Sequence, residues 1–352
     1  MDGRLAAIAA SQGGVFLRRQ ALECGYLQDE VDNAVRRRTW KPVRRGAYVE
    51  PHLVERVSEV ELHRLRVHAV VAASQSEPVV SGVSAAVFHG LDLWDQDLGR
   101  VQVTHPGFSS RVESDVHHHD AALDDAEVVW VSGLRATSIA RTAIDVARVS
   151  PSFESGLITL DSALRNARTT REELTRTTEL CSRWPNARGV ARMVRFADGR
   201  AANPGETRLR VTYAATGLPQ CYPQLYVYRP DRSLLAITDL AVLRHQTILE
   251  LDGRMKYGIA GQDPREQVYR EKLREDDLRE LGHEVARFSW AAAGDPRDVA
   301  RRAQAAFDRA RDRPAPTALY RLSEVTTAGV APVGPLLTWR EINELLDDQR
   351  SA

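Results

Sequence analysis

Cysteine is scarce in this chain: Cys24, Cys181 and Cys221 lie far apart, and no CxxC pair occurs. The sequence therefore speaks against a zinc ribbon, an iron–sulfur centre and a disulfide framework. No apolar run approaches the roughly 20 residues that a membrane-spanning helix needs. The N-terminus also lacks the basic and then apolar layout of a signal peptide. We therefore expect a cytoplasmic protein without a membrane segment.

Net charge is absent as well, because 48 Lys and Arg balance 48 Asp and Glu. No global field draws nucleic acid to the protein, so any such binding must come from local patches. The sequence has no P-loop, no GxGxxG and no GxSxG, and thus gives no basis for ATP, dinucleotide or serine-hydrolase chemistry. Its 352 residues, 43% apolar and 27% charged, are typical of a soluble protein with two to three domains.

Residues 1–55 predict a small helical unit that ends in a β-hairpin. Apolar residues at helical spacing, with stops at glycines, predict three short helices over 1–12, 17–22 and 29–38. The segment TWKPVRRGAYVE, residues 39–50, predicts a strand, a turn and a second strand. Helix, helix, basic helix and hairpin is the order of a winged helix-turn-helix.

The run from residue 36 to residue 45 holds six cations and no acid, at the junction of the third helix and the hairpin. Cations there would contact DNA phosphates, with Trp40 packing or stacking between them. A solvated basic turn is the alternative. The candidate DNA-binding residues of this segment are Arg36, Arg37, Arg38, Trp40, Lys41, Arg44 and Arg45.

Residues 56–195 predict a mixed α/β segment. Helices are expected over 57–73, from Ser81 to about Gly90, in RATSIARTAIDVAR and almost throughout 152–197, with strands in RVQVTHP and AEVVWVSG. We interpret His117-His118-His119 as a solvated loop, since consecutive residues do not readily face one ion. His89 is expected to be a buried histidine bound to backbone.

Acids interrupt apolar strand patterns in ITDLAVLRHQTILELDG. Glu250 and Asp252 share one strand face, and a neighbouring strand, joined through the turn 244–246, would place Asp239 beside them. Buried carboxylates are costly unless a cation or hydrogen bonds hold them. Hard oxygen ligands of this kind predict a Mg²⁺ (or Mn²⁺) site bound by Asp239, Glu250 and Asp252. The competing interpretation is that protein groups alone hold the acids of this region. Glu206 would then complete a capping box with Asn203, Asp239 would satisfy backbone groups at a strand edge, and Glu250 would pair with Arg244 or Arg254.

The stretches GETRLR, ITDLAV, ILELDG, KYG, YREKLREDDLRELGHEVARF and SW resemble the very-short-patch-repair-like endonucleases of the PD-(D/E)xK superfamily. The resemblance implies an α-β-β-β-α-β, restriction-endonuclease-like domain over 196–313, followed by a tail, 314–352, with one helix. The catalytic residues it implies are Glu206, Asp239, Glu250, Asp252 and Lys256. Asp252 stands where the family usually has lysine. Lys272 and Arg274 would bind DNA.

The stretch GGVFLRRQALECGYLQDEVDNAVRRRTWKPVRRGAYV resembles the N-terminal winged helix of AbiEi-type antitoxins, with weaker likeness in VSGVSAAVFHGL and GLRATSIARTAIDVAR. Two functions follow for this multidomain α/β protein. One is a Mg²⁺-dependent endonuclease, in phage defence or repair, that docks on double-stranded DNA. The alternative is an AbiEi-type antitoxin or transcriptional regulator with an inactive nuclease-like domain and a cognate toxin as partner. The oligomeric state stays open.

Overall fold

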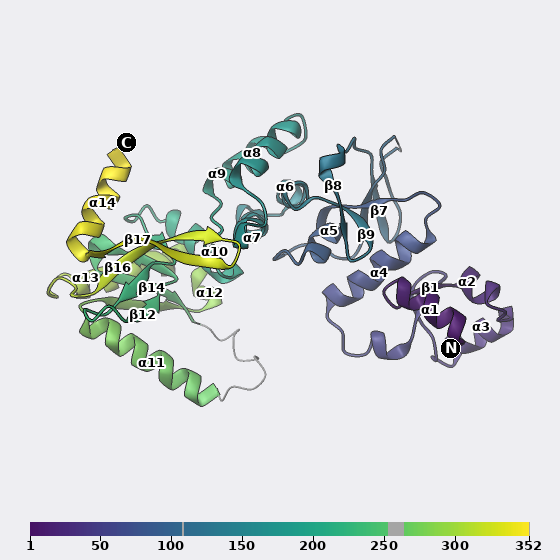
Figure 1. Ribbon diagram of the computed structural model, residues 1–352, viewed down its shortest axis with the longest axis horizontal. Helices are drawn as coiled ribbons and strands as arrows, with labels where there is room; N and C mark the ends of the chain where they lie inside the picture. The colour runs from purple at the N-terminus through teal and green to yellow at the C-terminus, as the bar shows by residue number, and fades with distance from the viewer. Residues whose placement is uncertain (108, 253–263, 352) are drawn as a thin grey trace. The chain divides into compact units, whose positions relative to one another are not determined.

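A computed structural model describes residues 1–107, 109–252 and 264–351. These residues form helices and four β-sheets, so the chain is a mixed α/β protein (Figure 1). Two compact units result, each of which takes two stretches of the chain. Unit 1 comprises Met1–Thr159 and Glu172–Met193, and unit 2 comprises Leu160–Arg171 and Val194–Ala352. The division into segments 1–55, 56–195, 196–313 and 314–352 stays a prediction.

Unit 1 begins with a small helical layer on a three-stranded antiparallel sheet of order β1-β3-β2. The elements are α1 (Gly3–Ser11), β1 (Phe16–Leu17), α2 (Arg18–Glu23), α3 (Gln28–Arg36), β2 (Lys41–Arg44) and β3 (Ala47–Val49). The three helices and the hairpin predicted from the sequence are therefore confirmed as elements. Asp2 caps α1 by accepting a hydrogen bond from the backbone N–H of Arg4.

Helix α4 (Glu59–Ala73) packs against apolar residues on two sides. Leu65 and Ala69 join the cluster under β1–β3, whereas Val67 and Val70 join the core of a six-stranded sheet. That sheet has the order β6-β7-β5-β4-β9-β8. Its strands are β4 (Val79–Val80), β5 (Val101–Thr104), β6 (Arg111–Val112), β7 (Val116–His119), β8 (Val128–Val131) and β9 (Leu134–Thr137).

The predicted helices of the middle segment are present. They are α5 (Gly82–His89), α6 (Ile139–Val149), α7 (Phe153–Leu164), α8 (Arg171–Leu180) and α9 (Ala187–Phe196). Ser81 precedes α5, and Gly90 ends it with a φ of 62°, a left-handed conformation that glycine adopts readily. His89 Nε2 donates a hydrogen bond to the Thr137 carbonyl oxygen, 2.7 Å away, so the expected bond to backbone is present, although His89 is half-buried rather than buried.

The three consecutive histidines correct the sequence interpretation. His117, His118 and His119 lie in strand β7, which pairs with β5 and β6, rather than in a solvated loop. The rings of His117 and His119 lie on the same side of the strand, with centroids 3.9 Å apart. Backbone pairing on both sides thus makes a strand of a segment whose composition shows no strand signature.

Unit 2 is built on a mixed sheet of order β10-β13-β14-β15. Its strands are β10 (Tyr222–Pro223), β13 (Leu240–Val242), β14 (Thr247–Leu251) and β15 (Glu284–Phe288). Alternating residues face two cores, as the period of a strand requires. Leu249 and Phe288 pack with helices α10 (Pro204–Ala214), α12 (Trp290–Ala293) and α13 (Pro296–Ala310). Ile248 and Val285 face the opposite core, which includes Leu278 of α11 (Pro264–Glu280).

The sequence predicted that the C-terminal segment is a tail with one helix. The structure shows two strands before that helix. The strands are β16 (Leu319–Thr326) and β17 (Gly329–Thr338), and the helix is α14 (Trp339–Ser351). With β11 (Tyr226–Tyr228) and β12 (Leu234–Ile237), these strands form a second sheet of order β12-β11-β16-β17. The hairpin and α14 therefore cover one face of unit 2 (Figure 1).

One stretch of unit 2 is divided between the two sheets. The apolar pattern of residues 235–243 predicts a single strand. Instead β12 ends at Ile237 and pairs with β11, whereas β13 starts at Leu240 and pairs with β14. Asp239 occupies the crossing point. The Asp239 carboxylate accepts a hydrogen bond from the Leu251 backbone N–H, 2.7 Å away, so the polar group is satisfied where the chain changes sheets.

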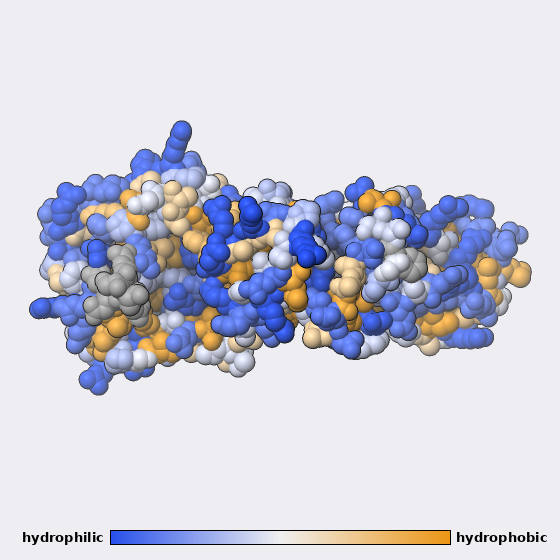
Figure 2. All heavy atoms as spheres, turned by 90° about the horizontal axis from the view of Figure 1, so that it is seen from above, coloured by the Kyte–Doolittle hydropathy of each residue, from blue (hydrophilic) through white to orange (hydrophobic). Residues whose placement is uncertain are grey.

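The face seen in Figure 2 shows mainly polar residues, interrupted by small apolar patches. Large exposed hydrophobic side chains include Trp130, Leu27 and Tyr269. Within the described part of the chain, no helix has both the length and the hydropathy to cross a bilayer.

His283 gives unit 2 a predictable acid sensitivity. Its ring is 1% exposed, one ring nitrogen lies 2.8 Å from the Tyr320 hydroxyl, and burial lowers its pKa to about 4. The unfolded chain therefore binds a proton at a higher pH than the folded one, so stability is lost as the pH falls below about 6.5. We expect a loss of about 2 kcal/mol between pH 8 and pH 5 from this group. Urea unfolding at both pH values, with His283→Gln as comparison, measures it; an equal pH dependence in the variant would contradict the assignment.

Candidate functional site

The predicted DNA-binding arginines lie on the surface of unit 1. Arg36, Arg37, Arg38 and Arg45 are exposed, and Lys41 is half-buried. Arg36 ends helix α3, and the next residues lead directly into β2. Exposed arginines therefore lie at the end of one helix and in the hairpin that follows it. Their role in DNA binding stays a prediction.

Trp40 does not belong to this surface. It is 5% exposed and packs edge-on against Phe16 and Tyr26, with ring centroids 4.8 and 5.2 Å apart. The indole is therefore unavailable for stacking between phosphates and instead forms part of the core beneath the hairpin. Arg44 is also tied to the protein, because its Nε lies 3.0 Å from Asp115 Oδ2 on the loop before β7.

Unit 2 brings three of the predicted catalytic acids to one cavity of about 210 Å³. We call it the carboxylate cavity. The residues that matter for its chemistry are Glu206, Asp239, Glu250, Glu271, Arg274 and Arg287. Asp252 is half-buried and does not line it. Lys256 lies outside the described residues, and Lys272 is exposed on α11 without lining the cavity.

Protein groups engage each of these acids. Glu206, 3% exposed, accepts hydrogen bonds from the Ala202 backbone N–H at 2.8 Å, from Asn203 Nδ2 at 2.6 Å and from Gln224 Nε2 at 2.9 Å. Asn203 in turn caps α10. The capping interpretation therefore accounts for Glu206 without any ion. Asp239 holds the Leu251 N–H, as described above.

Glu250 is neutralised by arginines that the sequence did not identify. Its Oε2 lies 3.3 Å from Arg274 and 3.6 Å from Arg287, the residue directly opposite on β15. Arg287 also pairs with Glu271 and Glu275. The competing expectation named Arg244 and Arg254 as partners. Arg274 was predicted to bind DNA, whereas here it forms an ion pair inside the cavity.

The described residues do not fit a metal centre. Among them, no group of three or more His, Cys, Asp or Glu is arranged to hold an ion. The carboxylate oxygens of Glu206, Asp239 and Glu250 already accept hydrogen bonds or form ion pairs with protein groups. A hard cation would compete with these groups for the same oxygens. Binding of Mg²⁺ or Mn²⁺ by these acids stays a prediction.

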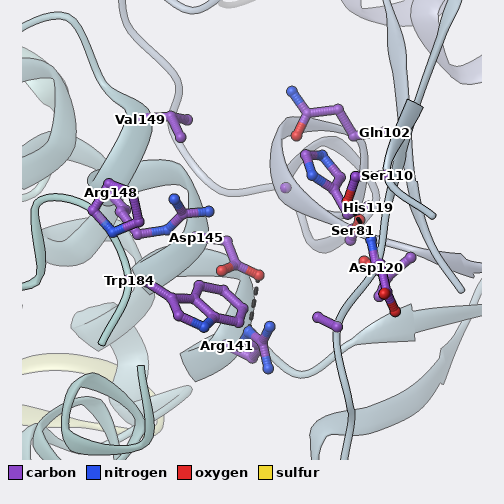
Figure 3. Close-up of a pocket in the computed structure, with 14 residues that line it drawn as sticks. Ser81, Gln102, Ser110, His119, Asp120, Arg141, Asp145, Arg148, Val149 and Trp184 are labelled. Atoms are coloured by element: carbon purple, nitrogen blue, oxygen red, sulfur yellow. Dashed lines mark hydrogen bonds and ion pairs between the residues drawn. The ribbon is translucent and has the colours of Figure 1, made fainter. Parts of the chain in front are cut away.

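A second cavity lies in unit 1, beside helix α6 (Figure 3). We call it the α6 cavity. It measures about 140 Å³, and its lining includes Ser81, Gln102, His119, Asp145, Arg148 and Trp184. Figure 3 shows Asp145 and Trp184 on one side, with Ser81, Gln102 and His119 facing them from the other. The sequence reasoning did not single out this group. The signal that could have found it is the i, i+4 pair of Arg141 and Asp145 in helix α6.

A buried charge network forms the helical wall of the α6 cavity. Arg141 Nε donates to Asp145 Oδ2 at 2.9 Å, and Arg141 also lies 2.8 Å from Glu127 Oε1. The Arg141 and Arg148 guanidinium carbons lie 4.6 and 4.9 Å from the Trp184 ring centroid, within the range of cation–π attraction. Burial raises the pKa of the Asp145 carboxyl.

Glycine is required at the opposite wall. Gly82 has a φ of 53°, and a Cβ added there would collide with the Oε1 atom of Gln102. The missing side chain therefore lets Gln102 lie over the start of α5 at the edge of the cavity. Burial and neighbouring cations lower the pKa of His119 to about 4, so its ring is neutral at physiological pH.

Comparisons with known proteins give a solved structure and a family model that are similar to parts of this chain. RV2827C protein from Mycobacterium tuberculosis, known from a crystal structure, is similar with 18% sequence identity and a TM-score of 0.37, over 58% of this chain and 78% of that chain. No curated protein gives a significant match. Residues 79–192, less than half of the chain, match the family model described as the AbiEi antitoxin C-terminal domain. The matched range contains every residue that lines the α6 cavity, and in it the chain is similar to that family of antitoxin domains.

Proposed function

We propose that this protein is an antitoxin-type transcriptional regulator that binds double-stranded DNA through a winged helix formed by residues 1–55. The observation that carries the proposal is the match of residues 79–192 to the AbiEi antitoxin C-terminal domain. The order of helices and strands in residues 1–55 and the exposed arginines at 36–38 support the DNA-binding part. A toxin that the antitoxin neutralises is the protein partner that the family name implies.

Binding to the DNA upstream of its own gene tests the regulator. Fluorescence anisotropy of a labelled upstream duplex, with a shuffled duplex as control, measures the preference. Specific sites are typically bound about 10³-fold or more tightly than non-specific DNA. Equal affinity for both duplexes would contradict a regulatory role. Co-expression with a toxin gene from the same locus tests the other half, and growth should be restored only when the full chain is present.

The Mg²⁺-dependent endonuclease is the alternative function. In its favour, Glu206, Asp239 and Glu250 line one cavity, as the resemblance to repair endonucleases implies. Against it, all three acids are held by protein groups. The same arrangement of acids is equally expected of a domain without nuclease activity, in which hydrogen bonds and ion pairs of these acids only stabilise the fold.

Asp239→Ala separates these two interpretations. If the cavity is structural, supercoiled plasmid stays intact with wild type and variant alike in Mg²⁺ or Mn²⁺. The variant then loses stability, of which the hydrogen bond to the Leu251 N–H accounts for about 1–3 kcal/mol. Gel electrophoresis of the plasmid and urea unfolding measure the two effects. Metal-dependent nicking by wild type that Asp239→Ala abolishes would establish the endonuclease instead.

A further inference from the structure

Strand β8 is an uncovered edge of the six-stranded sheet in unit 1. It pairs with β9 on one side, and no other described strand pairs with it on the other. Its sequence is VVWV, and the side chain of Trp130 is 72% exposed. The strand has no proline and no charged residue, and its pairing with β9 is regular. Folded proteins usually protect an edge with charges, proline or a bulge, because a free edge pairs readily with another strand.

The free side of β8 presents unpaired backbone groups. The Glu127 carbonyl oxygen accepts a hydrogen bond from the backbone that follows β9, so Glu127 faces that strand. Since the facing positions of an antiparallel pair alternate, Val129 also faces β9, whereas the N–H and C=O groups of Val128 and Trp130 point away from it. The Val128 N–H bonds to the Asp125 carbonyl oxygen. The Trp130 N–H and the carbonyl oxygens of Val128 and Trp130 have no partner among the residues that the structure describes.

These backbone groups fit a second copy of the same strand in one register. If two copies of β8 pair antiparallel about a two-fold axis at Val129, Val128 lies opposite Trp130 of the second copy. The Trp130 N–H of each copy then donates to the Val128 carbonyl oxygen of the other. An axis at Trp130 would instead pair Val128 with Ser132, a turn residue with a φ of 49°. In the first register each indole packs on the opposite valine and lies diagonally beside the other indole, within reach of an aromatic side chain.

The charges at the two ends of β8 favour the same antiparallel arrangement. Asp124 and Asp125 are exposed just before the strand, whereas the turn after it, Ser132 and Gly133, has no charge. Antiparallel pairing places the acids of each copy beside the turn of the other, whereas parallel pairing would place acid beside acid. Arg135 follows this turn and is 3.6 Å from the exposed Glu77, so a cation lies at the end of the hairpin that the acids approach.

We propose that the protein forms a two-fold symmetric dimer in which β8 of one copy pairs antiparallel with β8 of a second copy. The two six-stranded sheets then form one continuous sheet, with both copies of Trp130 on the same face. The contact is small, so the dimer is weak and reversible. Its use rests on the proposed function, because a dimer presents two winged helices to the two half-sites of a palindromic operator.

Sedimentation velocity of the full-length protein across the micromolar range, without DNA, measures the association. We expect a reversible conversion of monomer to dimer, and Trp130→Lys should weaken it at least about tenfold. Leu180→Lys is the matched control, because it removes another exposed apolar side chain, 61% exposed at the end of α8, with the same change of charge. This control should dimerise like wild type. A wild-type protein that stays monomeric, or equal association of wild type and Trp130→Lys, overturns the proposal.

Single cysteines test the register. Val129 would lie on the axis with the two Cα atoms about 4.5 Å apart, within the range of a disulfide. Val129→Cys should therefore give a covalent dimer on mild oxidation, seen by non-reducing electrophoresis. Val131→Cys, on the same face, would place the Cα atoms about 13 Å apart and should not exceed wild type, whose three cysteines set the background. No excess of covalent dimer in Val129→Cys over wild type overturns the pairing.

These measurements are separate from those on DNA. A monomeric protein that still prefers its upstream DNA would overturn only the dimer. A dimer that binds the upstream and the shuffled duplex equally would overturn only the proposed function.

Discussion

Replacing Arg36, Arg37 and Arg38 together with glutamine weakens binding to double-stranded DNA by about 10- to 100-fold at constant salt concentration. The three side chains are exposed at the end of α3, so their charges are available to phosphates and their removal leaves the core intact. Glutamine keeps most of the side-chain length while removing the charge. Titration of a labelled duplex in parallel for both proteins measures the loss.

The salt dependence distinguishes lost phosphate contacts from a damaged fold. Each contact contributes about 0.9 to the slope of log K against log salt concentration, so the triple variant should lower the slope by about 2–3. The matched control replaces Arg188, Arg192 and Arg195, three exposed arginines of α9, and changes the net charge equally. An equal loss of affinity in the control, or an unchanged slope in the variant, would contradict a DNA surface at residues 36–38.

Asp161→Ala destabilises unit 2 by about 3–5 kcal/mol, the cost of leaving one member of a buried ion pair alone. Asp161 is fully buried, and its carboxylate accepts three hydrogen bonds of 2.7 Å, from Arg210, Thr207 and the Asp198 backbone N–H. Through Arg210 and Thr207 it fixes helix α10, which carries Glu206. Hydrogen exchange of α10 peptides in the intact chain measures the loss of local stability.

Two further variants show whether the charge is responsible. Asp161→Asn keeps the shape and should cost less than Asp161→Ala. A double variant, Asp161→Leu with Arg210→Met, removes both charges and should recover part of the lost stability, because no buried charge is then left alone. If Asp161→Ala changed the exchange free energy by less than about 1 kcal/mol, the anchoring role would be refuted.

Helices were predictable because their signals are local. Gly90 and Gly282 stop α5 and α11, with φ values of 62° and 101°, and the apolar spacing of α6 marks its buried face. The hairpin of β16 and β17 was missed because Pro332 and Pro335 argue against a strand. Strand β17 lies at the edge of its sheet, where proline is tolerated since one side needs no backbone donor.

The sites were predictable only in part, because their decisive partners are distant in sequence. The spacing of the acids in the sequence correctly predicted that Asp239 and Glu250 lie close together. It gave no sign that Arg287 of the neighbouring strand β15 pairs with Glu250. Trp40 lies within a basic run, and its aromatic partner Phe16 is separated from it in the sequence by helices α2 and α3. The residues of the α6 cavity come from strands and helices between positions 81 and 185, with no shared motif.

Protection and cleavage of the same DNA test the central claim most directly. Supercoiled plasmid that carries the region upstream of the gene is incubated with the full-length protein and Mg²⁺, then probed with a footprinting nuclease and examined for nicks. A DNA-binding regulator leaves a protected stretch in the upstream region and an intact plasmid, and protection is lost with the Arg36, Arg37 and Arg38 variant. Nicks that depend on Asp239, without any protected stretch, would contradict this account.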